Sequence, residues 1–322
     1  RKAVDAKYLE TSVPATHRPT FDVAEDVDLN PIGDLVNLVE APAGYTVLGA
    51  GKTAMDACNW LLDNGVDPNK IRWIKPRDSW LLDRASVQPL DLIGGTWEVI
   101  SLGIEAMAKA EDLEDLLRRL EACGQIVRLD TTVEPTMFRG AILSQPERES
   151  LQQIEKVVRL GRVKHLARDR IALEGGEVTS EPGELYVDCT AYGLVSAPAR
   201  PVFEPGRITL QSSGQTGPHA AFVAFLEVSR EDDSEKNRLC RPVPTPSQAI
   251  DIIRVFAGLF AAVAARSALP DLAAWVRRSR LTLTRGLAEH MGDAPVQVAM
   301  GRFNENMQPA MKNAKALLVP AE

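Results

Sequence analysis

The chain has 322 residues, a mass of 35.1 kDa and a formal net charge of −7 at pH 7. This length allows one large hydrophobic core or two ordinary ones, and the contents of apolar (45%) and charged (25%) residues are typical of a soluble globular protein. The negative net charge, without any Lys/Arg run, argues against nucleic acid and anionic membranes as partners. Four cysteines without a C-x-x-C pair suit a reducing cytoplasm and predict no metal site.

The first residues read "RKAVDAKYLE", which includes no initiator Met and has the pattern of a strand inside a domain. We predict a strand over residues 3–9 and an irregular connector up to residue 43, because four prolines interrupt this stretch. These features indicate that the chain is part of a longer protein or a processed product.

From residue 45 onward, strand and helix patterns alternate. The stretch "YTVLGAGKTAMD" (residues 45–56) predicts a strand that runs into a glycine-rich turn, and apolar residues at helical spacing then continue to Asn64-Gly65. Residues 71–74 predict a second, parallel strand. Together these segments predict a βαβ unit.

The middle of the chain predicts further helices and short strands. Residues 79–122 are expected to be mainly helical, and residues 126–130 to form a short strand. Ser144-Gln-Pro-Glu147 is a capping box that predicts a helix up to about residue 160. Further predicted segments are three strands (163–166, 170–173 and 185–189), a strand with a helix (207–211 and 219–228), and helices from about residue 246.

The glycine-rich turn fits two kinds of ligand. Gly51-Lys52-Thr53 reads "GKT", as in the P-loop of nucleoside triphosphatases, and Asp188 at a strand end would then hold magnesium. A P-loop also needs a glycine five positions before Gly51, where this chain has Thr46. The same turn reads Gly49-x-Gly51-x-x-Ala54, a dinucleotide fingerprint in which Ala50, Lys52 and Thr53 fill the remaining positions. The spacing favours the dinucleotide.

Two other segments are candidates for contacts with this ligand. Lys75 and Arg77 follow the second strand, where cations favour the 2′-phosphate of NADP over the 2′-hydroxyl of NAD, although Asp78 follows directly and an ordinary charged loop is an alternative. The loop "QSSGQTGPH" (residues 211–219) offers Gln211, Gly214 and Thr216, with a plain connecting loop as its alternative. No residue pattern identifies a catalytic acid, base or nucleophile.

The order of these segments resembles the flavin-containing monooxygenase and pyridine-nucleotide reductase group of FAD/NAD(P)-binding oxidoreductases. The likeness covers residues 45–194, ends in "LYVDCTAYGL", and lacks the group's N-terminal FAD fingerprint. It implies an α/β fold with a Rossmann-like nicotinamide-binding domain, part of a split flavin domain, and a C-terminal helical region. The implied boundaries are 1–43 (strand and connector from the flavin domain), 44–192 (nicotinamide domain with a helical insert), 193–245 (returning flavin-domain segment) and 246–322 (helices).

The resemblance implies an NADP(H)-dependent, monooxygenase-like flavoprotein that acts on a small molecule. FAD would be bound if the missing N-terminal half is present, or if a partner chain supplies the flavin half; a homodimer is the other expected assembly. One alternative is a degenerate or split homologue that serves as a binding subunit or a non-redox enzyme. The P-loop nucleoside triphosphatase is a third hypothesis.

Overall fold

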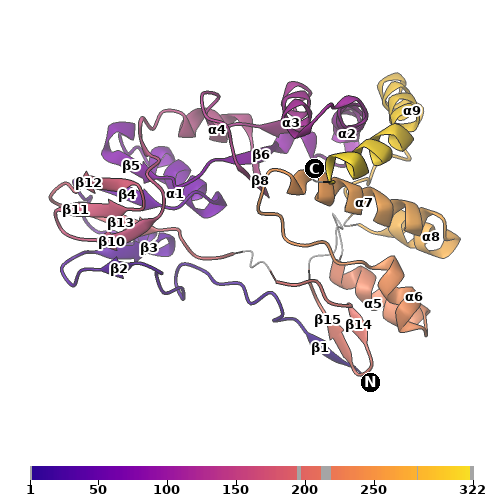
Figure 1. The fold of residues 1–322 in the computed structure, drawn as a ribbon, viewed down its shortest axis with the longest axis horizontal. Coiled ribbons are helices and arrows are strands. Elements are labelled where there is room, and N and C mark those ends of the chain that lie inside the picture. Colours follow the sequence, from indigo (N-terminus) through magenta and orange to yellow (C-terminus); the bar gives the residue numbers. More distant parts are fainter. Residues whose placement is uncertain (1, 194–196, 212–218, 281, 320–322) are drawn as a thin grey trace. The chain divides into compact units, whose positions relative to one another are not determined.

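The structure is a computed structural model that describes residues 2–193, 197–211, 219–280 and 282–319. It is a mixed α/β protein, which confirms the predicted α/β class, and it divides into two compact units (Figure 1). Unit 1 comprises Arg1–Glu10, Leu82–Val127 and Val195–Glu322, and unit 2 comprises Thr11–Leu81 and Arg128–Leu194. Residues 82–127, which contain most of the helical stretch expected at 79–122, therefore group with the C-terminal helices and not with the sheet around residues 44–74.

Unit 2 is built on a five-stranded sheet in which every pairing is parallel. Its strands, in spatial order, are β3 (Leu29–Pro31), β13 (Glu184–Asp188), β4 (Gly44–Leu48), β5 (Ile71–Ile74) and β9 (Lys156–Val158). The chain steps outward from β4 to β5 and β9, and then returns to β13 on the other side of β4. The direction of the strand order therefore changes at β4.

The fourth strand in chain order, β9, lies where the sequence predicted a helix. The capping box at Ser144 and Glu147 is present, but α4 spans only Gln145–Leu151. The prediction of a helix to residue 160 was wrong, because the β-branched pair Val157 and Val158 aligns with Trp73 and Ile74 of β5. This pairing supplies backbone partners that local propensity does not reveal.

A second sheet of unit 2 has the order β12-β11-β10-β2. Strand β11 (Arg170–Leu173) pairs antiparallel with both β10 (Val163–Leu166) and β12 (Gly176–Thr179), and β2 (Asp22–Val23) pairs in parallel with β10. It packs on the five-stranded sheet through a buried apolar cluster of Leu48, Ile74, Leu166, Ile171, Leu173 and Tyr186. The strands predicted at 163–166, 170–173 and 185–189 are confirmed.

Helix α1 (Lys52–Asp63) follows β4 directly through the glycine turn. Its fully buried residues at helical spacing are Ala54, Ala57, Cys58 and Leu61. None of them belongs to the cluster beneath the second sheet, and strand alternation turns Val47 and Trp73 away from that cluster. The helix therefore packs on the opposite face of the five-stranded sheet, as the predicted βαβ unit requires.

The segment predicted to be mainly helical, residues 79–122, begins with a strand instead. Strand β6 (Ser79–Asp83) is the middle strand of a three-stranded sheet, between β7 (Ile126–Val127) and β8 (Met137–Leu143). Helices α2 (Ile93–Lys109) and α3 (Leu113–Ala122) follow. They are separate because the Asp112 side chain accepts a hydrogen bond from Asp115 N (2.8 Å) and starts a new helix.

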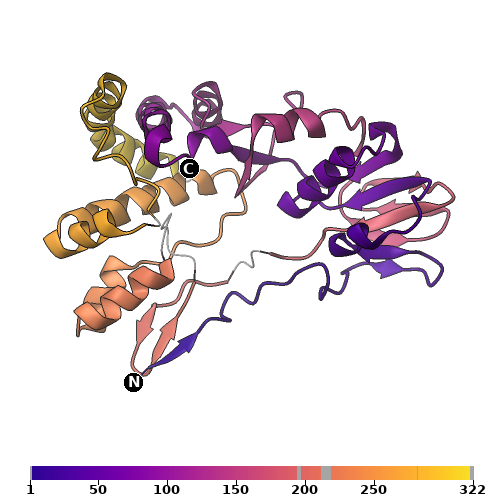
Figure 2. The ribbon, with the colours of Figure 1, turned by 180° about the vertical axis from the view of Figure 1, so that it is seen from behind.

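The β part of unit 1 is a small sheet with the order β1-β15-β14. Strand β1 (Ala3–Asp5) pairs in parallel with β15 (Arg207–Thr209), which pairs antiparallel with β14 (Phe203–Glu204). Figures 1 and 2 both show this sheet beside α5 (His219–Ser229) and α6 (Asp233–Leu239). The predicted strands near residues 3–9 and 207–211 are thus confirmed, although both are shorter than expected.

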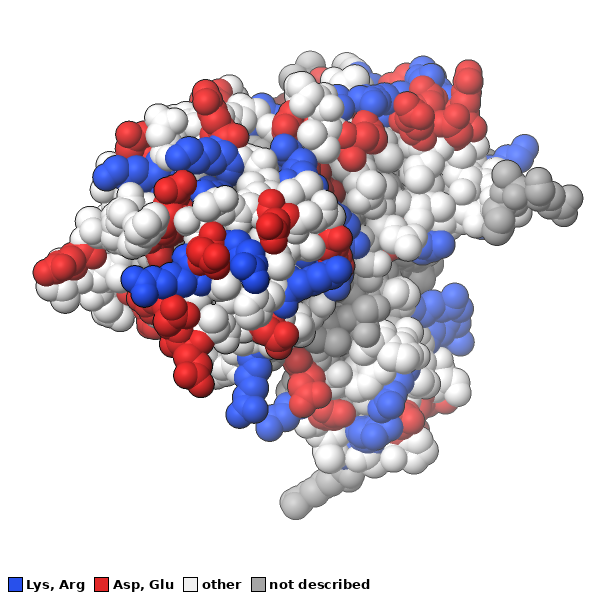
Figure 3. Space-filling model, turned by 60° about the vertical axis from the view of Figure 1, so that its left-hand side comes forward, with Lys and Arg blue, Asp and Glu red and all other residues white. Residues whose placement is uncertain are grey.

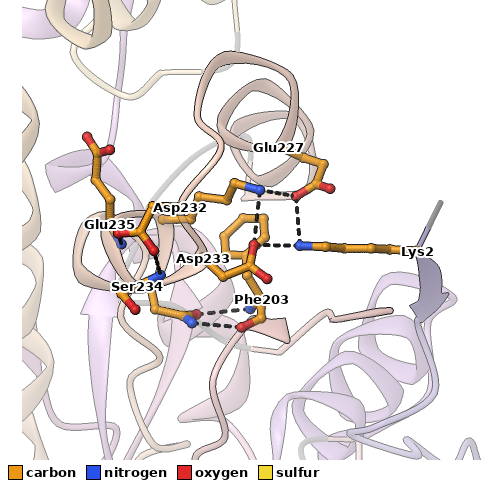
Figure 4. Close-up of polar contacts among 9 residues, drawn as sticks. Lys2, Phe203, Glu227, Asp232, Asp233, Ser234 and Glu235 are labelled. Carbon is orange, nitrogen blue, oxygen red and sulfur yellow. Dashed lines mark hydrogen bonds and ion pairs between the residues drawn. The ribbon is translucent and has the colours of Figure 1, made fainter. Parts of the chain in front are cut away.

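Four charged side chains join β1 to α5 and α6, and we call them the ion-pair square (Figure 4). Lys2 Nζ lies 3.3 Å from Glu227 and 2.5 Å from Asp233, while Lys236 Nζ lies 2.7 Å and 3.0 Å from the same two carboxylates. Both ammonium groups also lie over the ring of Phe203, at 5.6 and 5.4 Å from its centre. The square fastens the first strand of unit 1 to its helices.

The C-terminal helices are α7 (Asp251–Ser267), α8 (Pro270–Arg278) and α9 (Ala294–Leu317), and α9 packs along α2 within unit 1. Among the residues that the structure describes, no single helix is both long and apolar enough to cross a membrane; α7 and α8, bent by 112°, meet the criteria of length and composition only as a pair. The short 3₁₀ helices are Ile32–Asn37, Pro68–Lys70, Arg84–Ser86 and Leu90–Leu92.

Candidate functional site

A pocket of about 370 Å³ lies at the carboxyl ends of the central strands of unit 2. Its lining includes residues that directly follow β4, β5 and β13, namely Gly49 to Thr53, Pro76 with Arg77, and Cys189 to Gly193. Parallel sheets bind ligands in the crevice outside the carboxyl ends, at the point where the strand order reverses. The pocket occupies that point, because β4 lies between β5 and β13.

The glycine turn has the geometry that a close approach of backbone requires. Gly49 adopts a φ of +132°, and a Cβ at this position would lie 2.6 Å from the carbonyl oxygen of Cys189. A Cβ on Gly51, in contrast, would meet no atom within 4 Å. Gly49 is therefore needed for the packing of β4 against β13, whereas the space beside Gly51 is open to a ligand.

Helix α1 begins at this turn without a side-chain cap. Gly51 is the N-cap residue, and its carbonyl accepts from Ala54 N (3.1 Å) and Met55 N (3.2 Å). The earliest N–H groups of an α-helix have no partner within the helix and favour anions. Lys52 and Thr53, the first two residues of α1, both line the pocket. The structure thus places an uncapped helix N-terminus at the pocket wall.

Every charged side chain among the described residues that line the pocket is cationic: Lys52, Arg77, Arg139 and Arg162. On the face drawn in Figure 3, by comparison, Lys and Arg side chains are interspersed with Asp and Glu. Arg77 and Arg162 are exposed, and neither side chain has an ion pair within the described part of the chain. In a chain with a net charge of −7, this lining favours a ligand that carries several negative charges.

Lys75, which the sequence nominated beside Arg77, does not line the pocket. Its ammonium group is buried, pairs with Asp78 and lies 5.0 Å from the centre of the Trp73 ring. Ala54 is also buried, beneath the glycine turn, where the fingerprint needs a small residue. Of the predicted residues in unit 2, the pocket therefore brings together Gly49, Ala50, Gly51, Lys52, Thr53 and Arg77.

The second predicted segment is residues 211–219, of which the structure describes Gln211 and His219, and neither of these two is a lining residue of the pocket. Gln211 belongs to unit 1, where its side-chain amide accepts from Arg200 N (3.0 Å) and donates to Arg200 O (2.8 Å). Gly214 and Thr216 lie outside the described residues. Gln211 therefore has a structural role in holding residue 200 beside β15.

Arg139 and Arg162 were not predicted as site residues. Arg139 lies in β8, next to Gly140 at a φ of +70°, and Arg162 lies between β9 and β10. No element was predicted for residues 131–143, and a helix was predicted where β9 forms, so the local pattern gave no reason to place either arginine beside the glycine turn. The pairs Arg139-Gly140 and Gly161-Arg162 are the available hints in the sequence.

Lys52 is held at the pocket by two carboxylates. Its ammonium group pairs with Asp56 of the same helix and lies 3.2 Å from Glu147 of α4. Burial raises the pKa of Glu147, but hydrogen bonds from the Ser144 N–H and hydroxyl, together with Lys52, outweigh it and lower this pKa to about 2. Glu147 therefore stays ionised throughout the physiological range.

This lowered pKa predicts an acid-dependent loss of stability. The contribution of ionised Glu147 is fully present above the ordinary glutamate pKa, about 4.3, and is lost as the pH falls towards 2. We expect Glu147→Gln to lower the free energy of unfolding by about 1 kcal/mol at pH 7, because it weakens the capping box. The difference from the wild type should shrink below pH 4 in urea titrations, and a difference that is constant from pH 7 to pH 2.5 would contradict this assignment.

The chain resembles curated proteins whose names state no activity, and no model of a known protein family matches it. Over 302 residues, 92% of this chain, it is 40% identical to the uncharacterized protein Rv2000 of Mycobacterium tuberculosis. The same values hold for the uncharacterized protein Mb2023 of Mycobacterium bovis. The matched residues make up 55% of each relative, so the chain spans about half the length of the curated relatives it matches.

Proposed function

We propose that unit 2 binds NADP(H) in the pocket at the glycine turn, and that the chain is the nicotinamide-binding part of a flavoprotein oxidoreductase. The observation that carries this proposal is the placement of Gly49, Gly51 and the N-terminus of α1 at the reversal of strand order. In dinucleotide-binding folds of the Rossmann type, the strands run in the order 3-2-1-4, and the pyrophosphate lies on the first helix at this point. Strands β9, β5, β4 and β13 have that order.

The electrostatics of the pocket favour the phosphorylated dinucleotide. NADP carries a 2′-phosphate in addition to its pyrophosphate, and guanidinium groups bind phosphate through paired hydrogen bonds. Arg77 follows β5, the strand whose end meets the adenosine ribose in such folds. Arg139 and Arg162 line the same pocket and add two more cations to its lining.

Unit 1 supports the second half of the proposal. In the sequence, β1 precedes unit 2 and β15 follows it, and the two strands pair in parallel, as expected where a flavin domain is interrupted by a nicotinamide domain. By the proposed function, the residues at the glycine turn and Arg77 would hold NADPH, which would supply the hydride for reduction of FAD; the protein's own part is to bind and orient the cofactors, which would carry the redox chemistry.

Binding measurements test the dinucleotide half directly. We expect calorimetric titration to give micromolar binding of NADP⁺ and weaker binding of NAD⁺. Arg77→Ala and Arg162→Ala should each weaken NADP⁺ binding about tenfold, equivalent to ~1.4 kcal/mol, and leave NAD⁺ binding nearly unchanged, because only NADP⁺ carries the 2′-phosphate. Arg170→Ala, an exposed arginine of β11 paired with acidic neighbours, is the matched control.

The flavin half requires a separate experiment. The chain and a longer relative would each be incubated with FAD and then mixed with NADPH without oxygen. Bleaching of the flavin absorbance supports the oxidoreductase. Tight NADP⁺ binding without bleaching in either protein would favour the alternative, a binding subunit or a non-redox enzyme.

The contacts of the turn favour a dinucleotide over a nucleoside triphosphate. Strand β4 ends at Leu48 and leaves no loop to wrap phosphates, and the Lys52 ammonium is paired with Asp56 and Glu147. The buried Asp188 accepts from Thr190 N (2.8 Å) and its hydroxyl (2.6 Å), so its Oδ1 already has two donors. Magnesium-dependent ATP binding in the absence of NADP⁺ binding would reverse this preference.

A further inference from the structure

Asp78 lies between two residues that line the pocket, yet its own side chain turns away. Arg77 and Ser79 both contribute to the lining, whereas the Asp78 side chain is only 5% exposed. One carboxylate oxygen accepts from the Lys75 ammonium, and the other accepts from Arg159 Nε at 2.9 Å. Both oxygens of Asp78 are therefore occupied by cations inside unit 2.

The contact chain continues beyond Arg159. Its Nη2 lies 2.9 Å from Asp130 Oδ2, and Asp130 Oδ1 accepts from Thr132 N (2.9 Å) and the Thr132 hydroxyl (2.6 Å). Two cations thus balance two carboxylates in a network of Lys75, Asp78, Arg159 and Asp130. The network adds no net charge beside the pocket, and removing Arg159 would leave a net charge of −1.

This network is also connected to the glycine turn. Trp73 Nε1 donates to the carbonyl oxygen of Gly49 at 2.7 Å, and the same indole ring lies beneath the Lys75 ammonium. Burial lowers the pKa of Lys75, and the neighbouring Asp78 opposes that shift. The segment after β5 that carries Arg77 is therefore held by the hydrogen bond of Trp73 and by the ion pair of Lys75 with Asp78.

We propose that Arg159 is a positioning residue that, by holding Asp78 away from the pocket, makes the site prefer a phosphorylated ribose over one with a free 2′-hydroxyl. The inference rests on the proposed dinucleotide binding. An acidic residue near the end of the second strand accepts from the ribose hydroxyls where NAD is bound, and its charge repels a 2′-phosphate. Here such a residue is present one position after Arg77, but Arg159 and Lys75 occupy both of its oxygens.

The test compares Kd values for NADP⁺ and NAD⁺ in Arg159→Gln and the wild type. We expect the ratio of Kd for NAD⁺ to Kd for NADP⁺ to fall about tenfold, because one oxygen and one negative charge of Asp78 are released beside Arg77. Asp78→Asn in the Arg159→Gln background removes that charge and should restore much of the ratio. Arg159→Lys, which keeps the charge but offers no second donor in a fixed fork, should have an intermediate effect.

Arg72→Gln provides the matched control. Arg72 pairs with buried Glu184 at 3.2 Å, at the amino-terminal edge of the same sheet and outside the lining of the pocket. The Arg72→Gln substitution breaks an arginine–carboxylate pair of the same kind and should leave the ratio of the two Kd values unchanged. Thermal midpoints of all variants establish which of them fold.

The outcomes separate this inference from the function on which it rests. If the wild type binds neither dinucleotide, the proposed function fails and the inference fails with it. If the wild type binds NADP⁺ but Arg159→Gln weakens both ligands equally, or no more selectively than Arg72→Gln, Arg159 is merely structural and this inference alone is overturned. Failure of Asp78→Asn to restore the ratio would also overturn it.

Discussion

Gly49→Ala is expected to destabilise the protein by about 3 kcal/mol and to abolish dinucleotide binding. The added methyl carbon would lie 2.6 Å from the carbonyl oxygen of Cys189, and alanine is strained at a φ of +132°. The obstacle is the backbone of Cys189, directly after the central strand β13, so it cannot rotate aside as a side chain would. The shift in the urea unfolding midpoint, at constant slope, measures the effect.

Gly51→Ala separates folding from binding. No atom lies within 4 Å of its added methyl group, and Gly51 has no positive φ. We expect the free energy of unfolding to stay within about 0.5 kcal/mol of the wild-type value. NADP⁺ binding should nevertheless be at least ~tenfold weaker, because the methyl group occupies the space proposed for the pyrophosphate. If Gly49→Ala were as stable as the wild type, or if Gly51→Ala bound NADP⁺ normally, the assignment of the two glycines would be wrong.

The second large effect is expected in unit 1, where Lys236→Met should cost about 2 kcal/mol of unfolding free energy. The Lys236 side chain is only 4% exposed, and its removal leaves Glu227 and Asp233, each a little over one quarter exposed, with Lys2 as the remaining cation of the square. Breaking a fully buried pair costs more, about 3–5 kcal/mol, and we reduce that range because both carboxylates reach water.

Lys109→Met is the matched control for this prediction. Lys109 pairs with Glu105 one helical turn away, but its side chain is 57% exposed. Its loss should change the free energy of unfolding by no more than about 0.5 kcal/mol, and high salt should erase the difference. Urea unfolding of both variants at low and high salt compares them. Equal small effects would show that the ion-pair square contributes no more than a surface pair.

The sequence predicted the elements whose structure is set by local chemistry. The strand, turn and helix of residues 45–63, the capping box at Ser144, and the antiparallel strands near residues 163–173 all depend on spacing, caps and turns within a short window. The fingerprint residues Gly49 and Gly51 could be found for the same reason. Their place at a pocket wall follows from one strand and the turn after it.

The parts that were missed depend on partners far away in the chain. Strand β9 forms because β5 offers a free edge about eighty residues earlier, and the segment itself contains only two consecutive valines as a hint. Arg139 and Arg162 reach the pocket through β8 and the turn after β9, and neither strand was predicted, so both arginines were missed. Lys75 was assigned to the ligand from its position after the second strand. Its burial beside Asp78 and Trp73 is a tertiary property, which the sequence pattern does not reveal.

The pairing of β1 with β15 has a consequence for the order in which the molecule can form. Ala3 aligns with Arg207, so about two hundred residues, including all of unit 2, lie within the loop that this pair closes. A chain emerging from the ribosome can complete the sheet of unit 2 while its first strand still has no partner. Unit 1 must then form last, and refolding should show a slow phase in which the ion-pair square closes after the five-stranded sheet has been built.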